Sequence, residues 1–178
     1  MRHISYSLAL LACLTALPAA ASEHSFLDLG VVDEQRPSAV SGRGTLVAGS
    51  LALDERLSLF GEYQDEYSGG LALHDYAAGL GTHWMLAEQL ELSAAAGWAA
   101  KASPQKTDRG WLAKLSLRWT LTDRLELEPG IWRTAPGRGV NQLYADLRYR
   151  VGEKWAAGLG YAHGDGDRLL RAYLRFYL

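Results

Sequence analysis

The chain has 178 residues, with 18 Lys and Arg against 20 Asp and Glu. This near balance, without a basic run, argues against a nucleic-acid-binding protein. The length allows one domain after an export segment, and no stretch reaches the roughly 20 unbroken apolar residues that a membrane-spanning helix requires.

The N-terminal segment has the order of a secretory signal peptide. Met1-Arg2-His3 is short and basic, residues 4–17 are largely apolar, and Ala19-Ala20-Ala21 offers a small-residue cleavage site. We therefore expect removal of residues 1–21, leaving residues 22–178 as one outer-membrane domain. The alternative is a lipoprotein in which Cys13, the only cysteine, becomes the lipidated N-terminus.

Four short segments share one design, in which two large apolar residues lie four positions apart with mostly polar residues between them. They are residues 53–57, 86–90, 121–125 and 151–155. Side chains on both sides of each segment alternate between apolar and small or charged, with the period of a β-strand. Four hairpins in series, with one strand added at each end, predict a closed all-β antiparallel up-and-down barrel of about ten strands.

The strands alternate with different clarity along the chain. The first two, around residues 26–32 and 45–53, alternate weakly, and the first is counted partly because single-chain bacterial barrels have even strand numbers. Eight strands are the alternative. From Asp75 onward the alternation is clear. In the last strand, apolar residues beginning with Leu170 alternate with polar residues beginning with Arg171.

The composition of the polar face favours a membrane barrel over a soluble ligand-carrying barrel, which would place Leu and Trp inward. One strand carries Ala156, Gly158, Gly160 and Ala162 on its polar face. Small residues suit a narrow lumen, where they leave room for large side chains from the opposite wall. Strands of about 9–11 residues also match a tilted bilayer crossing.

Aromatic residues fall at two distances from the predicted turns, close to a turn or about six to ten residues away. This spacing approaches the ~25 Å height of the lipid-facing band, so we expect two interfacial girdles. The girdle residues are Tyr63, Tyr76, Trp84, Trp98, Trp111, Trp119, Tyr149, Trp155 and Tyr161. The alternative is that aromatic residues simply favour strands.

With the N-terminus in the periplasm, the four turns would lie on the periplasmic side. The expected extracellular loops are residues 33–42, 65–73, 101–108, 134–141 and 164–167. All are short, which limits what the protein could hold outside the cell.

Residues 57–63, 78–81 and 173–178 carry patterns that are repeated in many small barrels. On these the chain resembles the bacterial outer-membrane barrels grouped around the OmpA transmembrane domain, and most of all a ten-stranded family once described as a secreted quorum-sensing factor. The resemblance implies architecture rather than activity. It also implies a C-terminal insertion signal at Tyr173, Phe176 and Leu178, although Leu178 stands where an aromatic residue is usual.

The charged residues on the inward face form the group of side chains whose chemistry could matter for function. The predicted lumen network contains Glu62, Asp75, Glu91, Lys114, Arg118, Glu126, Glu128, Asp146, Arg148, Arg150, Arg171 and Arg175, with Asp28 beside them. We expect Arg118 to face Glu126 or Glu128, depending on register. Charges in a narrow lumen are costly unless paired, which favours a structural network; a water-filled pore is the alternative.

An outer-membrane enzyme is a competing interpretation. Its candidates are His163 with Asp165 and Asp167, and His74 with Asp75. His163 lacks the nearby serine that a lipid A deacylase pattern needs, and the histidines show no metal-ligand spacing. We therefore expect no catalytic, cofactor-binding or metal-binding residues.

The sequence thus predicts a non-enzymatic, monomeric integral outer-membrane barrel that is largely plugged by its own side chains. Its role would be in envelope structure or surface interaction, with a narrow porin-like channel as the alternative. The expected partners are outer-membrane lipids and lipopolysaccharide, and the barrel-insertion machinery during assembly.

Overall fold

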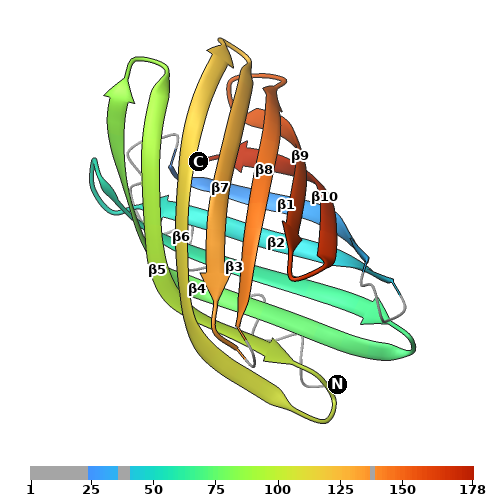
Figure 1. Ribbon diagram of the computed structural model, residues 1–178. Helices are drawn as coiled ribbons and strands as arrows, with labels where there is room; N and C mark the ends of the chain where they lie inside the picture. Colours follow the sequence, from blue (N-terminus) through green and yellow to red (C-terminus); the bar gives the residue numbers. More distant parts are fainter. Residues whose placement is uncertain (1–23, 36–40, 137–138) are drawn as a thin grey trace.

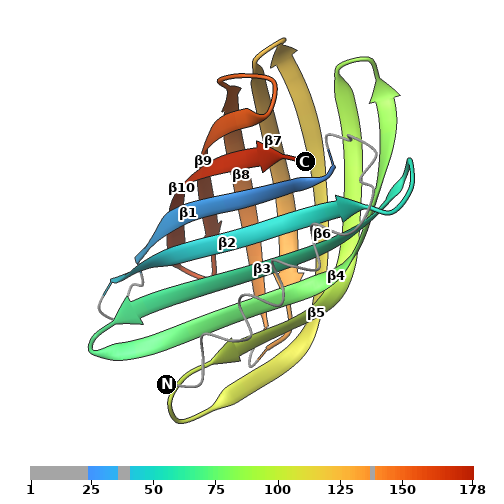
Figure 2. The ribbon, with the colours of Figure 1, turned by 180° about the vertical axis from the view of Figure 1, so that it is seen from behind.

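The computed structural model describes residues 24–35, 41–136 and 139–178, which form a closed antiparallel barrel (Figures 1 and 2). Its strands are β1 (Phe26–Gln35), β2 (Gly42–Ala52), β3 (Leu57–Ser68), β4 (Leu71–Ala87), β5 (Leu90–Ala102), β6 (Thr107–Thr122), β7 (Leu125–Thr134), β8 (Val140–Arg150), β9 (Trp155–Gly164) and β10 (Asp167–Tyr177). Each strand pairs with its sequence neighbours, and β1 also pairs with β10. The prediction of ten strands is confirmed, and the alternative of eight is wrong.

Figures 1 and 2 show strands that are strongly tilted, so that β1–β4 on one wall cross the direction of β6–β9 on the opposite wall. Such tilt is required to close a sheet into a barrel. Within the described ranges, no helix is long and apolar enough to cross a membrane. The predicted signal peptide, residues 1–21, lies outside those ranges.

The four predicted turns join β2 to β3, β4 to β5, β6 to β7 and β8 to β9, at the end of the barrel that we call the turn side. Two of these turns share one hydrogen-bond pattern, in which a side-chain oxygen accepts two backbone N–H groups. The Asp54 carboxylate accepts the N–H groups of Arg56 and Leu57, each at 2.7 Å, and the Thr122 hydroxyl occupies the same place in its turn. The N–H groups of Arg56 and Leu57 hold the pKa of Asp54 below its usual value.

The opposite end, which we call the loop side, is where the strands of the other five pairs end, within the ranges that the sequence predicted for the loops. Residues 36–40 and 137–138, which belong to two of the predicted loops, lie outside the described residues. Two of the five pairs are joined as tight hairpins. Gly69 and Gly70 have φ of 58° and 83°, and Asp165 and Gly166 have φ of 50° and 92°. Positive φ at both central residues is typical of a type I′ turn, whose twist matches that of paired strands.

The two faces of the barrel wall have the predicted polarity. On β8 Leu147 is 42% exposed while its neighbour Arg148 is 2% exposed, and on β6 Leu115 is 47% exposed while Ser116 is 3% exposed. A water-soluble barrel would bury the leucines and expose the arginine. This inversion contradicts the soluble alternative and is typical of a barrel surrounded by lipid.

Strand β9 carries small residues on its inward face, as the sequence predicted. A Cβ atom at Gly158 would collide with the Tyr173 ring, and one at Gly160 would collide with the side chains of Asp146 and Arg171. The prediction that small residues make room for large ones in the lumen is therefore confirmed.

Candidate functional site: the barrel lumen

Three ion pairs cross directly between neighbouring strands in the lumen, because the registers place the partners opposite each other. Glu91 faces Arg118 across β5–β6, Glu126 faces Arg148 across β7–β8, and Asp28 faces Arg175 across β1–β10. Their shortest N–O distances are 2.8, 3.0 and 2.7 Å. The Arg175 guanidinium binds both oxygens of Asp28, the bidentate geometry in which arginine pairs most strongly with a carboxylate.

Arg148 is the centre of the largest group of charges. Its Nε donates to Glu126 at 3.0 Å and its Nη1 to Glu128 at 2.7 Å. Arg150 Nη2 lies 3.2 Å from the second oxygen of Glu126, and Lys114 Nζ lies 3.6 Å from Glu128. Each of these two carboxylates therefore has two cationic partners.

Asp146 and Arg171 form a further pair that reaches across a strand. Both residues lie opposite Gly160 of β9 in their registers, and the absent side chain of Gly160 leaves room for a two-point contact, with Nε donating to Oδ1 at 3.0 Å. Glu62 lines the same part of the lumen as Lys114 and Arg171. Asp75 instead pairs with Lys101 at 3.4 Å, where both side chains are partly exposed.

Arg118 lies between two carboxylate-bearing strands. The β6–β7 register, with Ser116 opposite Gly130 and Trp119 opposite Leu127, sets Arg118 opposite Glu128, as the sequence predicted. Across β5–β6, Arg118 also lies opposite Glu91 and forms an ion pair with it at 2.8 Å, which the sequence did not predict.

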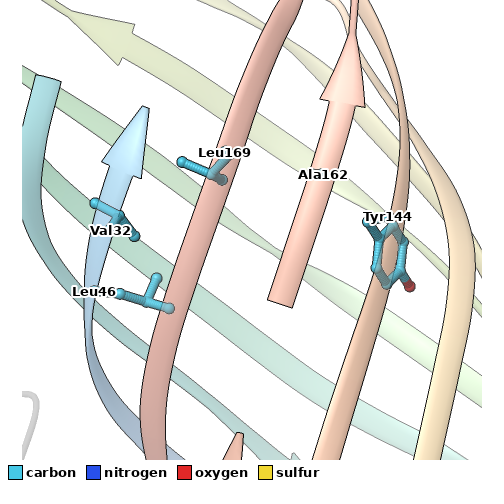
Figure 3. Packing of buried hydrophobic residues seen from close by; sticks show 5 residues of the cluster. All are labelled: Val32, Leu46, Tyr144, Ala162 and Leu169. Carbon is cyan, nitrogen blue, oxygen red and sulfur yellow. The ribbon is translucent and has the colours of Figure 1, made fainter. Parts of the chain in front are cut away.

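The lumen holds a polar cavity and an apolar cluster. A cavity of about 170 Å³ is lined by Asp28, Glu62, Lys114, Arg171 and other polar residues, and it is large and polar enough to hold water. Nearer the loop side, an apolar cluster of inward side chains has little or no exposure (Figure 3). This loop-side cluster consists of Val32, Leu46, Tyr144, Ala162 and Leu169.

The predicted girdle residues lie on the outward face, and eight of them are large exposed side chains. The registers pair Tyr63 with Tyr76 and Trp98 with Trp111, all in the set far from the turns. In the turn-side set, Trp155 packs against Phe176, with ring centroids 4.8 Å apart. Their role as interfacial girdles stays a prediction.

The residues of the predicted insertion signal face in different directions. Tyr173 is buried in the lumen against Gly158, Phe176 packs on Trp155, and the Leu178 N–H donates to the Ser25 carbonyl at 3.0 Å. The folded barrel therefore does not present these three side chains as one surface. Recognition by the insertion machinery stays a prediction about the unfolded chain.

The histidines that the enzyme alternative would use lie away from the lumen charges. His163 Nδ1 lies 3.0 Å from the backbone oxygen of Asp167, a contact within the β9–β10 hairpin. His74 Nδ1 lies 3.1 Å from Asp65 and 3.1 Å from the Tyr63 hydroxyl, rather than beside Asp75.

Sequence reasoning missed one cluster at the turn side. His24, His83 and Glu91 each offer a ligand atom, and these atoms lie within 4.8 Å of one another. The residues come from the segment before β1, from β4 and from β5, so no short spacing could reveal them. A search for histidines and carboxylates at the same predicted end of the lumen would have found them.

No protein-family model matches the sequence, and no curated protein is significantly similar to it. Solved structures do match. A KdgM porin in complex with disordered oligogalacturonate aligns with a TM-score of 0.53 at 10% identity, covering 86% of this chain and 99% of that chain. The fold is that of a small outer-membrane β-barrel.

Two further solved structures are similar. A second KdgM porin structure has a TM-score of 0.52, 10% identity and the same coverage. The translocator domain of autotransporter NalP from Neisseria meningitidis has a TM-score of 0.49 and 10% identity, covering 98% of this chain and 96% of that one. At such identities the likeness shows the fold alone, and the resemblance to the ten-stranded family stays a prediction.

Proposed function

We propose that the protein is a non-enzymatic integral outer-membrane barrel, with a lumen closed by its own side chains and a role in envelope structure or surface interaction. The outward face supports membrane insertion, because leucines are exposed there while arginines are buried inside. Outer-membrane lipids and lipopolysaccharide would then be its immediate surroundings.

The observation that supports a closed lumen is the extent to which side chains fill it. Buried ion pairs such as Glu126–Arg148 and Asp28–Arg175 occupy the turn-side half. The five members of the loop-side cluster, which come from β1, β2, β8, β9 and β10, are each less than 9% exposed. An apolar cluster that narrows the path hinders ions by excluding water.

Recordings in planar lipid bilayers would test this proposal. We expect little or no current from the unmutated protein. The double variant Leu46→Ser and Leu169→Ser should raise the conductance, because it makes the loop-side cluster smaller and polar. Leu147→Ser, on the lipid-facing side, is the matched control and should stay silent. A steady open-channel current from the unmutated protein would contradict a closed lumen.

A narrow channel for small solutes is the second candidate. The polar cavity of about 170 Å³ favours it, as does the fold that the chain shares with KdgM porin. A channel would conduct without any substitution, and its ion selectivity would follow the charges that line the cavity. The same recordings therefore separate the two functions.

A further inference from the structure

The segment before β1 crosses the turn-side mouth of the barrel. Strand β1 pairs with β2 and β10, yet His24 contacts residues of β4 and β5. Ser25 holds the crossing in place, because its hydroxyl accepts the Ala52 N–H at 3.0 Å and its carbonyl accepts the Leu178 N–H at 3.0 Å. These two hydrogen bonds fix the backbone at Ser25, and from there the His24 side chain reaches β4 and β5.

His83 and Glu91 meet His24 on the inner side of that wall. Glu91 faces Met85 in the β4–β5 register, which places His83 diagonally beside it on the inward face. His24 Nε2 lies 3.1 Å from Glu91 Oε2, and the His24 and His83 rings stack with centroids 3.5 Å apart. We call His24, His83 and Glu91 the mouth cluster.

The stacking indicates which protonation state the cluster favours. Two imidazolium rings face to face at this distance would repel each other, and Arg118 Nη2, 3.5 Å from His24 Nε2, adds another positive charge. At least one ring is therefore neutral in this arrangement, and a neutral imidazole is the form that binds a metal ion.

The donor atoms and their spacing match a transition metal. Two imidazoles and one carboxylate are the protein ligands of a common zinc site, with Zn–N of about 2.0–2.1 Å and Zn–O of about 2.0–2.2 Å. Tetrahedral ligands at such distances lie about 3.3–3.5 Å apart, close to the 3.1 Å between His24 Nε2 and Glu91 Oε2. The third ligand atom lies within 4.8 Å of the others, and the stacked His24 and His83 rings turn apart when both nitrogens point at one ion.

We propose that the mouth cluster binds a divalent transition metal ion of the zinc class. The metal lies between His24 Nε2 and Glu91 Oε2, and His83 completes the three protein ligands. All three residues line the polar cavity, which supplies water for the fourth position. The site ties the segment before β1 to the opposite wall of the barrel.

Arg118 and Ser93 surround the carboxylate of this site. Arg118 Nη2 donates to Glu91 Oε2 at 2.8 Å, and the Ser93 hydroxyl donates to Oε1 at 3.1 Å. These bonds orient Glu91, as groups around a metal-binding carboxylate commonly do. Arg118 Nη2 also lies 3.5 Å from His24 Nε2, so its positive charge opposes a bound cation, and the guanidinium moves aside when the ion binds.

Zinc titration of the untagged, full-length processed protein in detergent, after treatment with a chelator, tests the proposal. We expect one saturable zinc ion per chain, and a thermal unfolding temperature that rises with zinc because the ion binds the folded state. His83→Ala and Glu91→Gln should each lower the zinc affinity by more than about tenfold, since changes around a metal ligand already cost about 10–100-fold. Cobalt bound in place of zinc should give visible absorption that both variants lose.

Two variants serve as controls. His163→Ala removes a histidine on the outward face and should leave zinc affinity unchanged. Arg118→Gln removes the opposing charge and should raise the affinity, whereas a general loss of structure would lower it. If His83→Ala fails to fold, His83→Asn takes its place. Absence of saturable binding, or equal affinity in the unmutated protein and the His83 and Glu91 variants, would overturn the proposal.

Discussion

At the scale of single residues, the barrel wall is defined by the contrast between adjacent side chains. Leu147 and Arg148 are neighbours in β8, yet one is exposed on the outer face and the other is almost completely buried. Since the side-chain period of a strand is two, a register shift of one residue would exchange these environments. Each outward leucine therefore reports both strand register and membrane position.

Leu147→Arg tests that position. The substitution should lower the free energy of unfolding by about 2–4 kcal/mol if Leu147 lies near the middle of the bilayer. Val151→Arg, at the turn that follows β8, is the matched control and should cost at most about 1 kcal/mol near an interface. Urea-dependent unfolding in lipid vesicles would measure both, and equal costs at the two sites would mean that Leu147 is not at mid-membrane.

At the scale of strands, small residues on one strand leave space in the lumen for large side chains from its neighbours. Strand β9 presents Gly158 and Gly160 where β10 and β8 contribute Tyr173, Arg171 and Asp146. A larger side chain on β9 therefore displaces a neighbour that is itself buried. The strand tolerates enlargement poorly even though its own inward side chains contribute little volume.

Gly158→Val should destabilise the barrel by at least about 1–3 kcal/mol, the usual cost of overpacking, because its side chain would overlap the Tyr173 ring. Adding Tyr173→Ala should recover part of the loss by emptying that space. Gly152→Ala, at a turn where an added Cβ atom would meet no atom beyond its chain neighbours within 4 Å, should have little effect. Unfolding midpoints of the four proteins would show the rescue; no recovery in the double variant would argue against direct collision.

Strand order and inward–outward assignment could be predicted because both follow from local alternation. The turns around Asp54 and Thr122 and the small residues of β9 are likewise visible in the sequence. The ion pair of Arg118 with Glu91 was not predicted, because carboxylates on both neighbouring strands lie near Arg118 and the sequence does not rank them. The mouth cluster was missed because His24 reaches strands that are not adjacent to β1.

At the scale of the whole molecule, closure depends on the seam between β1 and β10. This seam holds the buried pair of Asp28 and Arg175, with the Arg175 guanidinium 3.5 Å over the Phe26 ring. The Ser25–Leu178 hydrogen bond lies at the turn-side end of the same seam. Loss of one charge there leaves the other buried without its closest partner.

Asp28→Ala and Arg175→Ala should each cost about 3–5 kcal/mol, the typical effect of removing one member of a buried ion pair. The double variant should cost clearly less than the sum of the two. Asp33→Ala and Arg43→Ala are the matched control, because that pair also involves β1 but is exposed, and each should cost less than about 1 kcal/mol. A double-mutant cycle by equilibrium unfolding would measure the coupling; additive costs at the seam would contradict a buried pair.

The same seam imposes an order in time on assembly. Asp28 and Arg175 are separated by 147 positions in the chain, so the contact that closes the barrel joins the first strand to be exported with the last. Until β10 arrives, β1 has an unpaired edge that could pair with other chains. Contacts of such long sequence separation form slowly, since chain entropy is lost before they stabilise anything. A chain interrupted within its last strand would therefore persist as an open sheet whose β1 edge stays unpaired.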